Sequence, residues 1–319
     1  MSTRVLTRRR VLGLMAASAA ALRSPLAFAE TPFTRWRGTA LGADAELTIR
    51  DPDQKRARRA ITDCIAEIDR VESVFSLYRP ASSLTTLNAV GSLDHPPADL
   101  VRVLTHAADV SVISDGAFDV TVQPLWDVFA RGATGSALEQ ARSLIGWQRL
   151  SIGRDRLAFD RPGMAATLNG IAQGHVTDRV AETLRRHGFD HVLVNLGEFA
   201  ALGDRAADEP WRIGVGWPDR EGLATVLGLS DRAVATSSPL ATTFDTGGGD
   251  NHLFDPRTGR SARGWASVSV IAKTAVQADA LSTAIAVAPK DAAETILAAG
   301  GGLEAVLIDG GQRVVRIRA

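Results

Sequence analysis

Strand-like and helix-like segments follow one another irregularly along this chain, and that order limits the folds open to it. Short apolar runs predict strands, at residues 43–49, 150–152, 156–159, 191–196, 211–215, 233–236 and 265–271. A terminal hairpin is predicted over residues 305–317, turning at Gly310-Gly311. Because a doubly wound parallel sheet needs regular strand-helix alternation, we predict an α+β fold with mixed or antiparallel sheets and packed helices.

The helices are predicted from apolar residues that recur at intervals of three and four. Residues 55–75 show this pattern most clearly, with Ile61, Cys64, Ile68 and Val71 on one face. Further helices are predicted over residues 98–114, 136–145, 276–287 and 291–299, and another runs from the glycine-rich segment 167–174 to Arg186.

The first 29 residues are typical of an export signal. Arg8, Arg9 and Arg10 precede an apolar stretch at residues 11–22, and Ala27-Phe28-Ala29 is a small-x-small cleavage site. The arginines fit the twin-arginine form of such a signal, and an ordinary secretory signal is the alternative. We therefore expect residues 1–29 to be removed and residues 30–319 to form a single periplasmic domain.

Composition excludes two classes of partner. Beyond the signal, no apolar run reaches the roughly 18 to 20 residues that cross a bilayer, so we expect no membrane span in the mature chain. Removal of the signal deletes five arginines and no acid, and the mildly acidic remainder argues against nucleic-acid binding. Cys64 is the only cysteine, which excludes an internal disulfide and, on an apolar helix face, predicts a buried thiol.

Two polar segments suit an anion and a cation. Residues 167–174, Thr-Leu-Asn-Gly-Ile-Ala-Gln-Gly, precede a helix, where glycines and free N–H groups suit a pyrophosphate; a plain turn is the alternative. On the alanine-rich helix over residues 276–287, Asp279 and Thr283 lie one turn apart, with Ser282 beside them. Such oxygens suit Mg²⁺, which takes one or two carboxylates plus phosphate oxygens; a capped polar pair is the alternative.

Three further segments carry candidate residues. His252 lies just before the turn at residues 255–259, where a near-neutral imidazole can accept a hydroxyl proton. Tyr78, the only tyrosine, follows the helix over residues 55–75; it either stacks on a flat heteroaromatic ring or fills the core or surface. Residues 116–125 combine a helix stop, a strand and a proline turn, in which Asp119 is either a turn cap or a ligand contact.

The order of these segments resembles that of the ApbE family of FAD:protein FMN transferases, over essentially the whole mature length. The resemblance is carried by residues 72–78, Leu84, Asn88 and residues 116–125, 169–178, 194–198, 211–214, 235–237, 252–259 and 267–283. It implies a T-fold-like architecture of two intimately associated lobes. It also implies a Mg²⁺-dependent transferase that moves FMN from FAD to a threonine or serine hydroxyl of an acceptor flavoprotein and releases AMP.

The resemblance also implies roles for individual residues. Mg²⁺ would be held by Asp279, Thr283, Ser282 and the Gly170 carbonyl, and His252 would be the base for the incoming hydroxyl. FAD would contact a larger set of residues, Tyr78, Ala117, Phe118, Asp119, Thr167, Gln173 and Phe254. These roles agree with phosphoryl transfer, which depends on positioning and charge neutralisation more than on covalent chemistry by the protein.

The sequence departs from the family pattern at three positions. Thr167 replaces a usual aspartate, Gln173 a common lysine and Leu41 an expected methionine, so the nucleotide half of the predicted pocket carries fewer formal charges. Residues 167–174 resemble a subset of the family that serves nitrous-oxide respiration, which implies a membrane-bound redox subunit as acceptor. Two alternatives use the same residues: an Mg²⁺-dependent FAD pyrophosphatase that yields FMN and AMP, and a periplasmic protein that only binds FAD.

Overall fold

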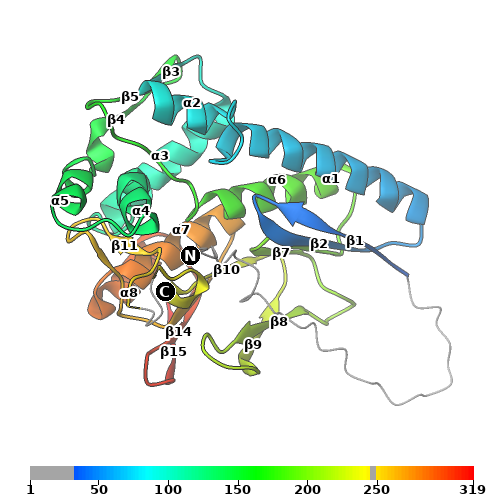
Figure 1. The fold of residues 1–319 in the computed structure, drawn as a ribbon. Coiled ribbons are helices and arrows are strands. Elements are labelled where there is room, and N and C mark those ends of the chain that lie inside the picture. Colours follow the sequence, from blue (N-terminus) through cyan, green and yellow to red (C-terminus); the bar gives the residue numbers. More distant parts are fainter. Residues whose placement is uncertain (1–31, 245–248) are drawn as a thin grey trace, which may run out of the picture.

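An eight-stranded sheet of antiparallel pairs forms the centre of the computed structural model, which describes residues 32–244 and 249–319 (Figure 1). Its strand order is β1-β2-β6-β7-β10-β13-β14-β15. These strands are β1 (Phe33–Ala40), β2 (Ala43–Arg50), β6 (Val192–Asn195), β7 (Phe199–Leu202), β10 (Ala233–Ser237), β13 (Ser267–Ala272), β14 (Glu304–Ile308) and β15 (Val314–Arg318). The predicted α+β class with antiparallel sheets is confirmed, and the predicted export signal lies outside the described residues.

Three helices cover one face of this sheet: α1 (Gln54–Phe75), α6 (Ala172–Arg186) and α7 (Ala275–Val287). Helix α7 packs on β10 and β13, α6 packs beside α7, and α1 packs against α6 (Figure 1). The apolar stripe predicted for α1 is buried, and the Asp53 carboxylate accepts the N–H groups of Lys55 and Arg56 at its start. Such an N-cap contributes about 1 kcal/mol to helix stability.

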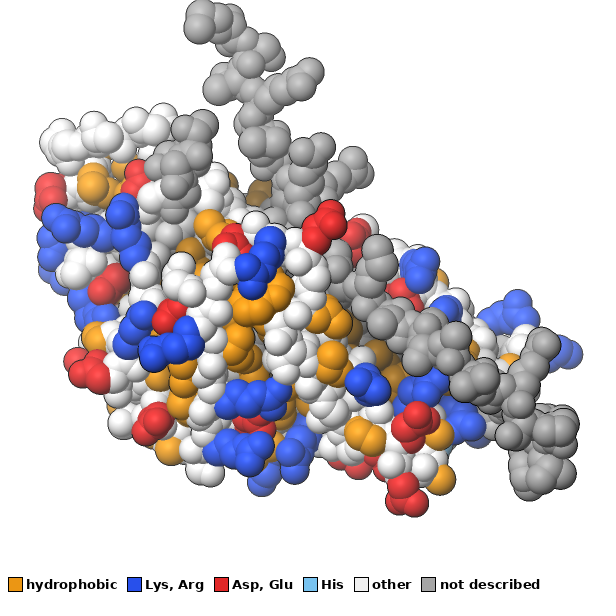
Figure 2. Space-filling view, turned by 90° about the horizontal axis from the view of Figure 1, so that it is seen from below, with side chains coloured by type: hydrophobic (Ala, Val, Ile, Leu, Met, Phe, Trp, Pro, Cys, Tyr) orange, Lys and Arg blue, Asp and Glu red, His pale blue; other side chains and the backbone are white. Residues whose placement is uncertain are grey.

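The other face of the sheet is partly covered by a hairpin of β8 (Trp211–Gly216) and β9 (Leu223–Leu229). Trp211, Ile213 and Leu227 of the hairpin are buried with Val234 and Ile271 of the sheet. Seen from below, this side of the molecule shows apolar side chains between arginine and lysine side chains (Figure 2). Strand β13 is therefore buried along its whole length, including its two serines, Ser267 and Ser269.

A second, mainly helical lobe packs against α1 and α7 (Figure 1). It contains α2 (Ser83–Val90), α3 (Ala98–Ile113), α4 (Gln123–Ala130), α5 (Ser136–Ser143) and a small sheet of β3 (Ser92–Asp94), β5 (Arg156–Phe159) and β4 (Leu150–Ile152). The remaining elements are the β11 (Phe254–Asp255) and β12 (Arg260–Ser261) hairpin and helix α8 (Ala293–Ala299). Beside this lobe, the first turn of α6 packs against the first turn of α7.

The strand predicted within residues 116–125 is wrong. A 3₁₀ turn occupies Val120–Val122, and α4 follows it directly. The Asp119 carboxylate accepts the N–H of Thr121 and so stabilises the turn, and Pro124 lies in the first turn of α4. Proline is tolerated in that position because its missing N–H has no helical partner there.

The single thiol lies in the core, as predicted. Cys64 is fully buried, and burial raises the pKa of its thiol to about 12, so the side chain is an unreactive part of the core. Across residues 32–244 and 249–319, no helix is both long enough and apolar enough to cross a membrane.

Candidate functional site

The starts of α6 and α7 are in direct contact, and this contact fixes the candidate site. A Cβ atom at Gly174 would lie 2.3 Å from the carbonyl oxygen of Ala275, so only glycine allows the two backbones to approach this closely. The Asp178 carboxylate accepts the N–H groups of Ala275 at 2.7 Å and Val276 at 2.9 Å. Asp279, one turn further along α7, accepts the Gly174 N–H at 2.9 Å. Helix α6 therefore sets the position of the Asp279 carboxylate.

Three hydroxyl groups lie beside Asp279, on α7 and on the neighbouring strand β10. Ser237 Oγ lies 2.8 Å from Ser282 Oγ and 3.0 Å from Thr283 Oγ1. Ser282 is fully buried and donates to the Asp279 carbonyl oxygen at 2.9 Å, whereas Thr283 is half-buried. Of the two hydroxyls predicted as metal ligands, Thr283 is thus the accessible one, and Ser282 is engaged inside the protein.

Gly170 and Phe118 close the other side of Thr283. A Cβ atom at Gly170 would lie 3.0 Å from Thr283 Oγ1 and 3.3 Å from Cε2 of Phe118. Gly170 therefore packs closely against the threonine oxygen, because even a methyl group at this position would be crowded. The structure brings together Gly170, Phe118 and Thr283, which belong to three separate segments of the sequence.

Three acids in this region carry raised pKa values. Burial raises the pKa of Asp279 to about 7, although the hydrogen bond from the Gly174 N–H lowers this pKa. Burial, and then the neighbouring Asp279 carboxylate, raise the pKa of Glu198 well above its usual range, and burial raises that of Asp178 to about 6. No arginine or lysine of the described part of the chain offsets the charge of Asp279 or Glu198. A pair of neighbouring acids such as Asp279 and Glu198 favours the binding of a cation.

The donor set fits Mg²⁺ in its chemistry. No cluster of three or more histidine, cysteine or acidic side chains able to hold a metal is present in the described parts of the chain. An ion here would instead use one carboxylate, one hydroxyl and a backbone carbonyl, with substrate phosphates completing the shell, as Mg²⁺ does in phosphoryl-transfer enzymes. The close approach of the Gly170 backbone to the Thr283 oxygen is consistent with that set.

Gln173 connects the start of α6 to two turns of the sheet. Its Nε2 atom donates to the carbonyl oxygens of Ala40 at 3.1 Å and Leu196 at 2.7 Å. Gly197, which has a positive φ of 100°, lets the second turn approach, because a Cβ there would lie 2.7 Å from the Gln173 side chain. Both amide protons of Gln173 thus bind backbone, and the residue holds the turns around the site.

Tyr78 follows helix α1 and has an exposed ring. Its exposed fraction is 72%, which leaves the ring accessible to a flat ligand. The neighbouring Arg79 pairs with Glu72, and Glu72 Oε1 accepts the N–H of Leu41 at 2.7 Å. Leu41 adopts a positive φ of 49° in the β1–β2 turn, so Glu72 connects this turn to the segment that carries Tyr78.

His252 has a defined tautomer when neutral. Its Nδ1 atom lies 3.1 Å from the carbonyl oxygen of Thr242, in the loop that follows β10. A carbonyl oxygen only accepts, so Nδ1 carries the proton and Nε2 is the basic nitrogen of the neutral ring. This is the form that a general base needs.

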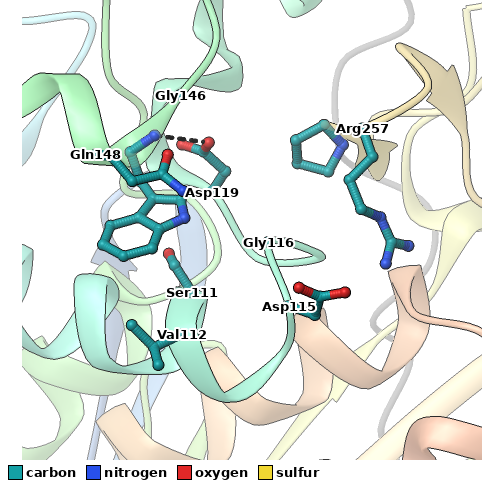
Figure 3. A pocket seen from close by; sticks show the side chains of 10 residues that line it. Ser111, Val112, Asp115, Gly116, Asp119, Gly146, Gln148 and Arg257 are labelled. Carbon is teal, nitrogen blue, oxygen red and sulfur yellow. Dashed lines mark hydrogen bonds between the residues drawn. The ribbon is translucent and has the colours of Figure 1, made fainter.

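The carboxylate of Asp119 acts as a turn cap. It accepts from Thr121 N and Oγ1, both at 2.7 Å, and from Trp147 N at 2.9 Å. Beside it lies a pocket of about 420 Å³, at whose opening Asp115 faces Arg257 (Figure 3). Of the two interpretations given for Asp119, the structure shows the cap.

The remaining predicted FAD contacts differ in accessibility. Phe254 is buried in an aromatic cluster, with ring centroids 4.9 Å from Phe129 and 5.9 Å from Phe244. Ala117 is also buried, and Thr167 is half-buried and donates its N–H to Val120 O at 2.7 Å. The Phe254 side chain therefore stabilises the loop that carries His252 and does not lie open to a ligand.

Four residues of the site were not given roles from the sequence: Glu72, Asp178, Glu198 and Ser237. Each lies within a segment that carries the family resemblance, and that was the available signal. Their roles depend on partners about 30 to 100 residues away in the chain, such as Leu41 for Glu72 and Ala275 for Asp178. Residue type alone does not reveal such contacts.

Comparison with known proteins places this geometry in a family. The sequence model of the ApbE family matches residues 41–307. The curated FAD:protein FMN transferase of Salmonella typhimurium is 27% identical over 287 residues, which cover 84% of this chain and 79% of that protein. The apo flavinyl transferase ApbE of Pseudomonas stutzeri is 27% identical with a TM-score of 0.79, covering 92% and 96% of the two chains.

A second solved structure supports the fold alone. The flavin transferase ApbE from Vibrio cholerae superposes with a TM-score of 0.79 at 23% identity, covering 90% of this chain and 98% of that one. The family match spans most of the chain, and the solved relatives share its sheet-and-helix architecture. This chain belongs to the ApbE family.

Proposed function

We propose that this protein is an FAD:protein FMN transferase, which moves FMN from FAD to a threonine or serine hydroxyl of an acceptor protein. The observation that carries the proposal is the uncompensated acid and hydroxyl cluster at the contact of α6 and α7, in a chain of the ApbE family. Its relatives are named for this activity, and the cluster supplies what phosphoryl transfer requires.

Asp279, Thr283 and the Gly170 carbonyl would hold Mg²⁺, with Ser282 behind them. Bound there, the ion neutralises negative charge on the pyrophosphate of FAD. The buried Asp279 carboxylate is oriented by Gly174, and Asp178 fixes the helix that carries it. The protein thus arranges oxygen atoms in advance, so that little reorganisation is needed when the substrate binds.

His252 acts as the base. Nε2 takes the proton of the acceptor hydroxyl while the hydroxyl oxygen bonds to the FMN phosphorus. The phosphoanhydride bond between this phosphorus and the AMP half breaks at the same time. AMP leaves with the electron pair of that bond, and FMN remains joined to the acceptor as a phosphoester. General-base catalysis contributes about 10² to 10⁴ to the rate.

FAD is bound by the residues around this cluster. The exposed ring of Tyr78 stacks on a flat ring of the substrate, and Phe118 and Ala117 support the segment beside Gly170. Thr167 contributes a neutral contact, while Gln173, Asp119 and Phe254 act by holding the surrounding turns.

The same proposal includes the location and the acceptor. The arginines and cleavage site in residues 1–29 support export to the periplasm by the twin-arginine route. The resemblance of residues 167–174 to the nitrous-oxide subset favours a membrane-bound redox subunit of that pathway as acceptor.

The test is to incubate residues 30–319 with FAD, Mg²⁺ and a candidate acceptor domain that carries the threonine, and to measure intact mass. We expect the acceptor to gain one FMN and AMP to appear in equal amount, with neither product in EDTA. An acceptor in which valine replaces the threonine is the control and gains nothing. AMP and FMN released without any adduct would make the protein a pyrophosphatase, and FAD retained without AMP would make it a binding protein.

A further inference from the structure

A row of three hydroxyl groups connects β10 to the metal-binding side of α7. Ser237 Oγ, on the last residue of β10, lies 2.8 Å from Ser282 Oγ and 3.0 Å from Thr283 Oγ1. Ser282 Oγ in turn donates to the carbonyl oxygen of Asp279 at 2.9 Å. The row therefore begins at the accessible threonine and ends on a backbone carbonyl inside the helix.

Counting protons fixes the direction of every hydrogen bond in this row, because a hydroxyl has one proton to donate and two lone pairs. Ser282 gives its proton to the Asp279 carbonyl, so the Ser237–Ser282 bond must be donated by Ser237. Ser237 has then used its proton, so the Ser237–Thr283 bond must be donated by Thr283. The three bonds run in one direction, from Thr283 through Ser237 and Ser282 to the Asp279 carbonyl oxygen.

We propose that Ser237 is a positioning residue of the metal site, which accepts the Thr283 proton and so turns the lone pairs of Thr283 Oγ1 toward the cation position. This inference rests on the metal site of the proposed function. A hydroxyl binds a cation through its lone pairs, and its proton must point away. Without an acceptor behind it, the Thr283 hydroxyl can rotate and direct its proton into the site.

The surroundings of Thr283 support this orientation. Gly170 lies against the threonine, so closely that a Cβ atom there would be 3.0 Å from Oγ1. Ser237 and Ser282 lie on the protein side, where Ser282 is fully buried. The proton of Thr283 is thus drawn to the interior. Hydrogen-bond partners behind a metal ligand typically change metal affinity by about 10-fold to 100-fold.

The chain contains a matched control on the opposite face of the same sheet. Thr236 precedes Ser237, so its side chain lies on the other face, and its Oγ1 is 2.8 Å from Ser269 Oγ of β13. Ser269 is fully buried, like Ser282, but lies on the face away from α7. Ser269→Ala therefore removes a part-buried hydroxyl bond to the neighbouring residue of β10 without touching Thr283.

The experiment measures equilibrium binding of Mn²⁺, a paramagnetic substitute for Mg²⁺, to residues 30–319 by the EPR signal of free Mn²⁺. We expect Ser237→Ala to weaken binding about tenfold, Ser237→Thr to restore it, and Ser269→Ala to leave it unchanged. We expect Thr283→Val to weaken binding at least as much, and Ser237→Ala to add nothing in the Thr283→Val background. Thr283→Ser, which keeps the hydroxyl, should bind like the original protein.

The coupling between the two positions separates positioning from general stability. The proposal is overturned if Ser237→Ala binds Mn²⁺ normally, or if the losses of Mn²⁺ affinity in Ser237→Ala and Thr283→Val add up in the double variant. It is also overturned if Ser269→Ala loses as much Mn²⁺ affinity as Ser237→Ala. If the unaltered protein fails to bind Mn²⁺, both the metal site and this inference are wrong. If it binds Mn²⁺ with the expected coupling but transfers no FMN, the proposed function fails and the role of Ser237 stands.

Discussion

The backbone N–H of Gly174 donates to Asp279 Oδ2 at 2.9 Å, so the first turn of α6 holds a carboxylate that belongs to α7. Only 4% of Asp279 is exposed, and no basic side chain of the described residues offsets its charge. A buried charge without a partner destabilises a folded protein, and such a cost is usually retained for function. The relationship predicts opposite effects of one substitution on stability and on activity.

Asp279→Asn should abolish Mg²⁺-dependent FMN transfer and raise the stability of the metal-free protein. The amide oxygen can still accept from Gly174, while the charge that burial disfavours is gone. We expect the free energy of unfolding in EDTA at pH 8 to rise by about 2 kcal/mol, measured by urea denaturation. Mg²⁺ should stabilise the original protein but not the variant; normal transfer by Asp279→Asn would contradict the metal assignment.

Gly170→Ala should weaken metal binding without unfolding the protein. The added Cβ would lie 3.0 Å from Thr283 Oγ1 and 3.3 Å from Phe118, so it would crowd the threonine oxygen. We expect the Mg²⁺ concentration for half-maximal activity to rise by about tenfold, with a loss of stability of about 1 kcal/mol. Gly216→Ala is the control, because its nearest neighbour would be 3.8 Å away. Equal effects of the two substitutions on the Mg²⁺ requirement would refute the crowding argument.

His252→Gln should slow transfer while FAD still binds. The glutamine can hydrogen-bond but cannot take a proton near neutral pH, so we expect kcat to fall by about 10² or more. The residual rate should also lose the acidic limb of its pH profile, measured by single-turnover kinetics with excess enzyme. FAD affinity, measured separately by fluorescence, should change less than threefold. A variant with an unchanged rate and pH profile would remove the base role from His252.

The periodic elements were predictable because burial repeats in the sequence. Helix α1 was expected over residues 55–75 and forms at Gln54–Phe75, and strands β4 and β5 match the expected residues. Strand β1 was missed, since exposed residues alternate along it at the sheet edge and Arg35 and Arg37 interrupt any apolar run. The strand expected before Pro124 was wrong because Val-Thr-Val favours strands locally, whereas the Asp119 cap and the proline start a helix.

The sequence identified residues of the candidate site, but not the contacts between them. Asp279 and Thr283 share a helix face by their spacing alone, as expected. The contact of Ser237 with Thr283 joins residues 46 positions apart, and that of Asp178 with Ala275 joins residues 97 apart. Such contacts depend on how α6, α7 and β10 pack, so the family resemblance could locate their segments without giving their partners.

The buried histidine of α6 predicts how stability depends on pH. His175 is 4% exposed, with Nε2 3.3 Å from an oxygen of Asp99, and burial lowers its pKa to about 4 despite that carboxylate. The folded protein therefore keeps His175 neutral, while the unfolded chain takes up a proton below its usual pKa of about 6.5. The contribution of His175 to stability is full above pH 6.5 and is lost as the pH is lowered toward 4.

The size of this effect can be measured against a variant that cannot titrate there. A pKa shift of two to three units corresponds to about 3 kcal/mol. Between pH 7 and pH 4, the free energy of unfolding of His175→Gln, measured by urea titration, should therefore fall by about 3 kcal/mol less than that of the original protein. His95→Asn is the control, because His95 is exposed and asparagine tolerates its positive φ of 50°. Glu67 does not disturb this comparison above pH 4.5. Arg70 and Arg179 lower the pKa of Glu67 to about 2, although burial opposes them, so Glu67 changes the free energy of unfolding only below pH 4.5. Parallel pH curves for His175→Gln and the original protein would contradict the assignment.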